Sequence, residues 1–160
     1  MTRAERQLKI EAYGRAHATL VEALREFPEE MWRFRPSPAD WSIHEIVVHI
    51  ADSEASSYIR CRKCIVEPGQ TVMAYDEGQW ARALDYAGQS ADDALELFRV
   101  LRRNTWRLIQ NLPEATWSNV MDHPENGRMT LEDWLDVYTR HIPEHVDQMR
   151  RVHAAWLRQR

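Results

Sequence analysis

The chain has 160 residues, of which 44% are hydrophobic and 29% are charged, a composition typical of a folded globular protein and not of a disordered one. A formal net charge of −4 gives no basic surface for a phosphate backbone, so a nucleic-acid-binding protein is not expected. The length predicts a single domain over residues 1–160.

Membrane and secreted classes are also disfavoured. No apolar run approaches the ~18 residues that a membrane-spanning helix needs, so no membrane partner is expected. Residues 1–10 carry charges and lack the apolar centre of a signal peptide. Two cysteines cannot form a disulfide framework, and together these features predict a cytoplasmic location.

The first half of the chain predicts two long helices. Apolar residues recur at three- and four-residue steps over residues 4–27, and Pro28 ends this helix. Ser42 followed by Glu45 is a capping box, which predicts that a second helix begins at residue 43. Pro68 and Gly69 end that helix.

A connection of about 20 residues follows at 70–89, with a short helix predicted at 76–85; a connection of this length is more often functional than idle. Ser90 opens the third long helix and Pro113 follows its end. The Asn126-Gly127 pair predicts a small hairpin. Thr130 with Asp133 then opens the last helix. We therefore expect an all-α four-helix bundle with a long connection between helices 2 and 3.

The last helix carries a histidine pair. His141 and His145 are four residues apart, so they share one face, and two imidazoles so placed can bind one metal ion. Both fall in the apolar stripe, where an unpaired imidazole is costly to bury. The alternative is a pair of partly buried histidines with hydrogen-bond partners. Pro143 lies between them, although proline disfavours the interior of a helix. Either a functional site requires this residue there, or it only kinks the helix.

A tightly held metal needs a third ligand, and three other histidines are considered for that place. His49 lies beside apolar residues on the second helix, whereas His44 is five positions earlier, next to the cap and therefore expected near solvent. His17, in the middle of the first helix's stripe, is the rival candidate. The residues alone favour His49 and leave His17 open.

Three separated segments resemble the DinB/YfiT-like family in the same order: Trp41–Arg60, Ala74–Trp80 and His141–His145. The resemblance covers roughly residues 30–150. It implies a four-helix bundle in which His49, His141 and His145 hold a divalent ion, with zinc or nickel expected. Relatives of this kind are metal-dependent S-transferases that use bacillithiol or mycothiol, or metal-dependent hydrolases, and they are often homodimers. The sequence departs from the YfiT-like pattern at Glu54, where that pattern has a histidine.

Together with the three histidines, the resemblance implies a divalent-metal-dependent enzyme that transfers a low-molecular-weight thiol to a small electrophilic substrate and that forms a homodimer. Three neutral imidazoles leave positions open on the ion, where a thiol or a water can be activated. Metal-dependent hydrolysis is therefore the alternative reaction, and a non-enzymatic metal-binding module is the third hypothesis.

Three further positions have candidate roles. Asp52, one turn after His49, is the nearest carboxylate on the second helix and could orient a ligand or relay a proton; a solvated carboxylate is the alternative. Tyr75 and Trp80 lie in the long connection and are predicted to bind substrate as a wall or lid. Cys61 and Cys64 form a C-x-x-C at the end of a helix, whereas redox motifs begin one, so a redox role is not expected.

Overall fold

The computed structural model describes residues 1–159, and the chain there is mostly helical. Four long helices form the bundle: α1 (Arg3–Leu24), α2 (Ile43–Val66), α4 (Ala91–Ile109) and α5 (Leu131–Leu157). A short helix, α3 (Glu77–Ala83), and an antiparallel hairpin of β1 (Val120–His123) and β2 (Gly127–Thr130) lie in the connections. Two short 3-10 segments, Glu29–Met31 and Glu114–Ser118, complete the described elements. The all-α bundle expected from the sequence is confirmed.

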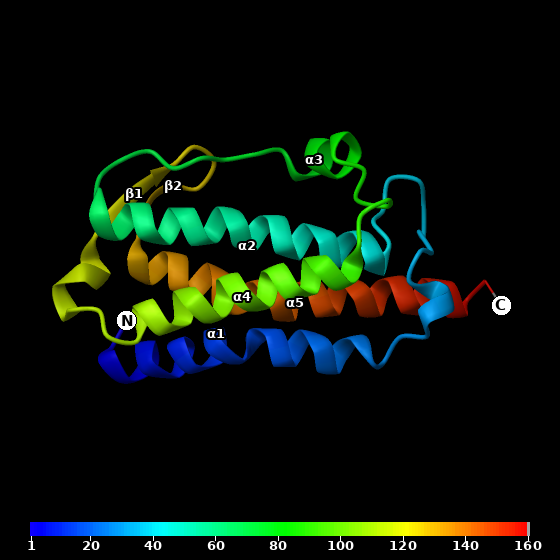
Figure 1. Ribbon diagram of the computed structural model, residues 1–160, viewed down its shortest axis with the longest axis horizontal. Helices are drawn as coiled ribbons and strands as arrows, with labels where there is room; N and C mark the ends of the chain where they lie inside the picture. Colours follow the sequence, from blue (N-terminus) through cyan, green and yellow to red (C-terminus); the bar gives the residue numbers. More distant parts are fainter. Residues whose placement is uncertain (160) are drawn as a thin grey trace.

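The helices are connected in an order that requires the long connection (Figure 1). α1 and α5 run in one direction, and α2 and α4 run in the other. Contacts join α1 to α4 and α5, and α2 to the same two helices. Because α2 and α4 are neighbours with the same direction, the chain must return along the whole length of α2 before α4 begins. Residues 67–90 make this return, which places them over the face of α2.

Capping fixes where the helices start. Thr2 with Glu5, Ser42 with Glu45, and Thr130 with Asp133 each form a complete capping box, which satisfies free amides of the first turn. The first helix differs from the prediction at both ends, since it begins at Arg3 and ends at Leu24. Pro28 disfavours helical backbone in the residue before it, and residues 25–27 form turns instead.

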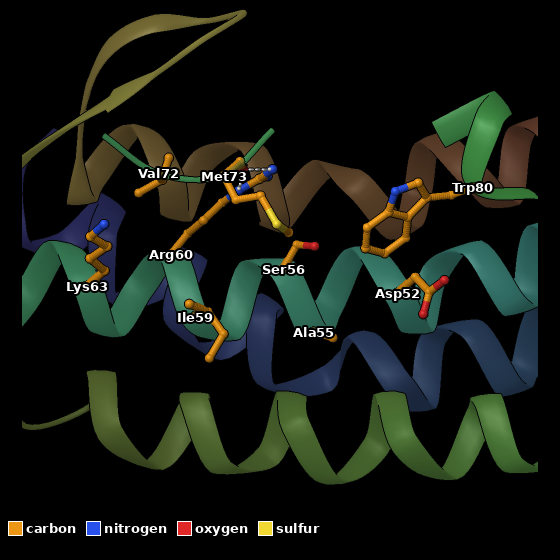
Figure 2. A pocket seen from close by; sticks show the side chains of 9 residues that line it. All are labelled: Asp52, Ala55, Ser56, Ile59, Arg60, Lys63, Val72, Met73 and Trp80. Atoms are coloured by element: carbon orange, nitrogen blue, oxygen red, sulfur yellow. Dashed lines mark hydrogen bonds between the residues drawn. The ribbon is translucent and has the colours of Figure 1, made fainter. Parts of the chain in front are cut away.

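A strap, residues 69–76, runs along α2 (Figure 1) and is held by hydrogen bonds to β1 and to α2. Its first part pairs with β1: Gly69 N–H donates to Val120 O at 2.7 Å, and Val72 N–H donates to Asp122 O at 3.0 Å. From α2, Arg60 Nε and Nη2 donate to Met73 O at 2.9 and 2.6 Å (Figure 2). The hairpin that anchors the strap closes through Gly127, whose φ of +72° is a conformation that favours glycine.

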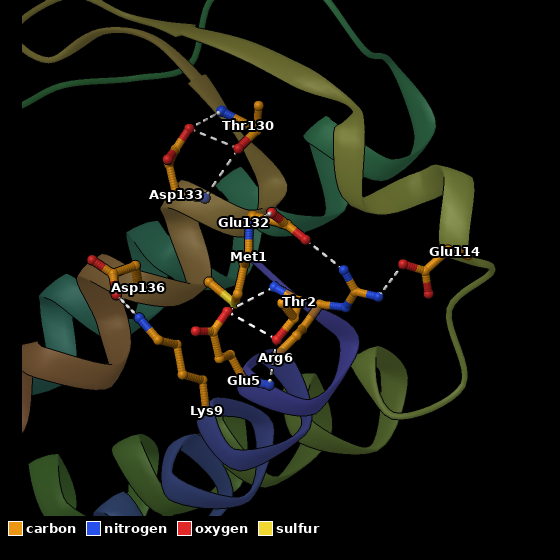
Figure 3. Close-up of polar contacts among 10 residues, drawn as sticks. All are labelled: Met1, Thr2, Glu5, Arg6, Lys9, Glu114, Thr130, Glu132, Asp133 and Asp136. Carbon is orange, nitrogen blue, oxygen red and sulfur yellow. Dashed lines mark hydrogen bonds and ion pairs between the residues drawn. The ribbon is translucent and has the colours of Figure 1, made fainter.

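Ion pairs join the start of α1 to the start of α5 (Figure 3). Arg6, which is 4% exposed, contacts Glu132 of α5 and Glu114 of the preceding connector. Lys9 pairs with Asp136 one turn further along. These contacts hold the two parallel helices in register. Within residues 1–159, every helix is too short or too polar to cross a membrane.

Candidate metal centre

Two helices that run in opposite directions, α2 and α5, bring three histidines together. His49 comes from the N-terminal part of α2, and His141 and His145 come from successive turns of α5. α5 continues through Pro143, which lies on its exposed side and lacks the N–H that Thr139 O would otherwise accept. The spacing of four residues therefore survives, and both imidazoles face α2.

The three side chains form a compact group of nitrogen donors. One ligand atom from each of them lies within 4.8 Å of the other two. His141 Nε2 and His145 Nε2 are 3.1 Å apart, and their rings meet edge to face at 88°. The His49 ring is 4.9 Å from that of His145 and 5.8 Å from that of His141, centre to centre. Nitrogens at these separations can surround a single ion.

Burial keeps the three imidazoles neutral at physiological pH. His49 is fully buried, which lowers its pKa to about 3, with His145 adding to the shift. Burial also lowers the pKa of His141 well below its usual value and lowers that of His145. A neutral imidazole is the form that binds a metal, so the site holds its donors in the correct protonation state.

The His49 ring shows that these residues fit a divalent ion. Its Nδ1 and Nε2 are both buried and have no hydrogen-bond partner among residues 1–159. An unpaired buried polar group destabilises the fold by roughly 1–3 kcal/mol. A cation placed among the three histidines would accept the His49 lone pair, and imidazole is a common ligand of zinc, copper, iron and nickel.

Two polar side chains contact the histidines from outside the group. Gln148 Oε1 lies 2.8 Å from His145 Nδ1, so Nδ1–H donates to it and leaves the Nε2 lone pair facing the other histidines. Ser53 Oγ lies 3.3 Å from His141 Nε2. Sequence reasoning missed both, although each lies within one helical turn of a ligand candidate: Gln148 follows His145 by three positions and Ser53 follows His49 by four.

The long connection supplies the cover of the site. Glu77 Oε1 lies 3.8 Å from His49 Nε2, and burial raises the pKa of the Glu77 carboxyl. Tyr75 and Trp80 stack on each other with ring centres 4.3 Å apart. Trp41 packs on the His49 ring at 4.8 Å. Glu77 was not expected from the sequence, because only the path of the connection brings it here. Trp41 lies directly before α2, and its contact with His49 was not expected either.

The other candidate residues have different surroundings. Asp52 Oδ2 accepts a 2.6 Å hydrogen bond from the Tyr86 hydroxyl, and no contact to the three histidines is found for it within residues 1–159. His17 packs on Phe98 of α4, with ring centres 5.9 Å apart, outside the histidine group. His44 was expected near solvent, and this is wrong: it is 6% exposed, and its Nε2–H donates to Gln89 O at 2.9 Å.

The C-x-x-C cysteines are buried away from the histidines. Cys61 and Cys64 are free thiols that pack in the core beside α5. Burial raises the pKa of Cys61 to about 12 and that of Cys64 to about 11. Both are therefore protonated and unreactive at physiological pH, as the sequence position indicated.

The fold and the site together define a class of protein: a helical bundle with a cluster of three histidines, one buried and two partly buried, that is suited to a divalent ion. The chain belongs to the DinB superfamily, whose sequence profile matches residues 12–157. This confirms the family resemblance seen in the three sequence segments.

Similar proteins carry names that refer to metal-dependent chemistry. "Putative metal-dependent hydrolase OB0782" of Oceanobacillus iheyensis is 27% identical over 106 residues, which are 66% of this chain and 61% of that protein. "Putative metal-dependent hydrolase BcerKBAB4_2443" of Bacillus mycoides is 25% identical over 134 residues, which are 82% of this chain and 77% of that protein. The chain thus spans about three-fifths of the first of these relatives.

A solved structure shares the fold. It is described as "YfiT from Bacillus subtilis is a probable metal-dependent hydrolase with an unusual four-helix bundle topology". The two structures superpose with a TM-score of 0.87 over 95% of this chain and 87% of that one, at 22% sequence identity.

Proposed function

We propose that the protein is a divalent-metal-dependent enzyme that transfers a low-molecular-weight thiol, of the bacillithiol or mycothiol type, to a small electrophile. One observation carries this proposal: three neutral imidazoles converge, and the two buried ring nitrogens of His49 have no hydrogen-bond partner within residues 1–159. Such a donor set holds an ion and leaves positions for an incoming ligand.

The donor set suits activation of a thiol at such a position. None of the three donors carries a negative charge, so they leave the charge of the ion undiminished. A bound divalent ion lowers the pKa of a thiol or water that occupies an open position. In the proposed reaction a sulfur–carbon bond forms, while the thiol proton and the leaving group, such as chloride, depart.

The surrounding residues have defined tasks in this proposal. Gln148 holds His145 in one tautomer, and the Ser53 hydroxyl contacts His141. The stacked pair of Tyr75 and Trp80 forms a wall over the connection side of the centre and keeps bulk water away from the reacting groups. In this proposal Tyr75 and Trp80 contact the substrate, as the sequence analysis predicted for them.

Hydrolysis is the second candidate function, and Glu77 favours it. A carboxylate whose oxygen lies 3.8 Å from a ligand candidate is placed to accept a proton from an attacking water. Partial burial raises the pKa of Glu77 toward the range where general bases work best. The names of the relatives point to the same reaction class.

One experiment separates the candidates. The protein is stripped of metal, reloaded with zinc or nickel, and assayed with a panel of thiols against chlorinated and epoxide electrophiles, and with water against esters and amides. Metal-dependent thiol conjugation supports the transferase; ester or amide cleavage without thiol supports the hydrolase. His49→Ala is the inactive control and His44→Ala is the matched active control. Tight metal binding with neither activity supports a metal-binding module and contradicts both enzymatic functions.

A further inference from the structure

A groove with a volume of about 310 Å³ lies between α2 and the strap (Figure 2). It begins at Asp52 and Trp80 and ends at Lys63 and Val72. Asp52 and His49 are separated by one turn of α2, so the groove starts next to the metal centre. At the same end of the groove, Trp80 stacks on Tyr75. Tyr75 lies two residues before Glu77 in the chain, and the carboxylate of Glu77 approaches His49.

Apolar side chains dominate the lining. Ala55 and Ile59 contribute from α2, and Val72 and Met73 contribute from the strap. Ile59 and Met73 are 60% and 55% exposed, although large hydrophobic side chains gain from being covered. A ligand in the groove would cover both.

The charged residues along the groove already have partners. Arg60 donates to Met73 O with two of its nitrogens and to the Tyr138 hydroxyl with the third. Lys63 Nζ donates to Thr71 O at 2.9 Å, and Asp52 accepts from Tyr86. A charged ligand would lose its hydration here and find few new hydrogen bonds, whereas an uncharged one would lose little.

The groove is preformed and small. Its outer wall, the strap, is fixed by hydrogen bonds to β1 and to Arg60 and Lys63. Ligand pockets range from about 300 to 1,000 Å³, so this one is at the lower limit. A volume of that size suits one aromatic ring or a short alkyl chain and excludes a peptide helix, whose diameter is about 10 Å.

We propose that this groove binds the uncharged, apolar body of a small molecule, and that this body belongs to the substrate whose reactive end reaches the metal centre. The first half of this proposal concerns binding and stands without a metal. Its second half rests on the proposed function.

The test titrates three probes of equal ring size, namely benzyl alcohol, benzoate and benzylamine, into metal-free and metal-loaded protein, with binding measured by amide chemical shifts. Benzyl alcohol is expected to bind with a roughly millimolar Kd and to shift amides of residues 55–59 and 72–73. Benzoate and benzylamine are expected to bind at least about tenfold more weakly.

A matched pair of variants locates the site. Ile59→Glu places a charge in the groove and is expected to lower the affinity for benzyl alcohol about tenfold. Val66→Glu makes the same change at a 75% exposed position of α2 outside the groove and should leave the affinity unchanged. Both positions are exposed, so both variants should fold.

Three results would overturn the inference: no binding of benzyl alcohol, equal binding of benzoate, or equal affinity in Ile59→Glu and the unchanged protein. Binding to the metal-free protein does not depend on catalysis, so it distinguishes this proposal from the proposed function. Turnover that persists in Ile59→Glu with an unchanged KM for an aromatic electrophile would overturn the assignment of the groove to the substrate.

Discussion

Arg102 and Glu54 form an ion pair inside the bundle: Arg102 Nη2 donates a 2.6 Å hydrogen bond to Glu54 Oε2, and both side chains are 1% exposed. The Tyr13 hydroxyl donates to the other Glu54 oxygen at 2.8 Å, and Arg102 Nη1 donates to Tyr138 O at 3.2 Å. One residue from each of the four long helices thus takes part. The departure from the family pattern at Glu54 is accounted for by a contact inside the core.

Removing the charge of Glu54 should destabilise the protein strongly. Glu54→Gln leaves the Arg102 guanidinium buried without a counter-charge, which costs about 3–5 kcal/mol. The surface pair of Glu96 and Arg99 gives a matched control, since Glu96→Gln removes a solvent-exposed charge and should leave the unfolding midpoint almost unchanged. Urea unfolding of the two variants measures both. Equal urea midpoints for the two variants would show that the buried pair contributes no more to stability than the surface pair.

Metal content should depend on the three clustered histidines. His49→Ala, His141→Ala and His145→Ala are each expected to lose the ion on dialysis, because two imidazoles hold it weakly. His44→Ala and His123→Ala should retain it, since neither residue belongs to the cluster. Elemental analysis gives the metal-to-protein ratio. A full complement of metal in His49→Ala would contradict the assignment of His49 as a ligand.

Gln148 should influence affinity without being a ligand. Gln148→Ala removes the acceptor that fixes the His145 tautomer, and loss of such a partner typically weakens metal binding about 10–100-fold. Glu144→Ala changes an exposed neighbour on the same helix and should have little effect. Competition with a chromophoric chelator measures both affinities, and identical values would contradict the role of Gln148.

The metal-free protein should lose stability in acid. The folded-state pKa of His49, about 3, lies below the ~6.5 of an unfolded histidine, so the unfolded chain binds more protons between these values. The free energy of unfolding therefore falls as the pH drops through this window, by roughly 2 kcal/mol at pH 5 for His49 alone. Carboxylates titrate in this window as well, so the His49→Gln variant serves as the reference. If the free energy of unfolding falls with pH equally in the unchanged protein and in His49→Gln, the contribution assigned to His49 is contradicted.

The cysteines should resist thiol reagents. Their pKa values of about 12 for Cys61 and about 11 for Cys64 leave almost no thiolate at pH 8, and both side chains are buried. A disulfide-exchange reagent is expected to react slowly with the native protein and with both thiols once urea unfolds it. Fast reaction of either thiol in the native state would contradict this.

Local sequence signals predicted most of the helical fold. Side-chain capping requires only neighbours three positions apart, so the starts of α2 and α5 were visible at Ser42 and Thr130. The direction of α4 relative to α2 was not visible, because it depends on how far the connection travels before Ser90. The same connection explains the error at His44, which is covered by Gln89 at the end of the return path.

Sequence signals likewise indicated some residues of the candidate site and not others. A spacing of four residues placed His141 and His145 on one face, and the apolar neighbours of His49 turned it inward. Glu77 carries no such signal, since it follows an extended strap and reaches His49 only because Arg60 and β1 hold that strap in place. Contacts made by irregular backbone depend on tertiary structure, which periodicity does not encode.

More than half of the chain lies between His49 and His141, so an ion shared by α2 and α5 would act as a removable cross-link across a very long loop. Any ligand that binds only the folded form shifts the folding equilibrium in proportion to its concentration. The supply of metal would then set how often the two helices separate. Protease resistance would rise and fall with the availability of the ion, which couples the lifetime of the protein to the metal status of the cell.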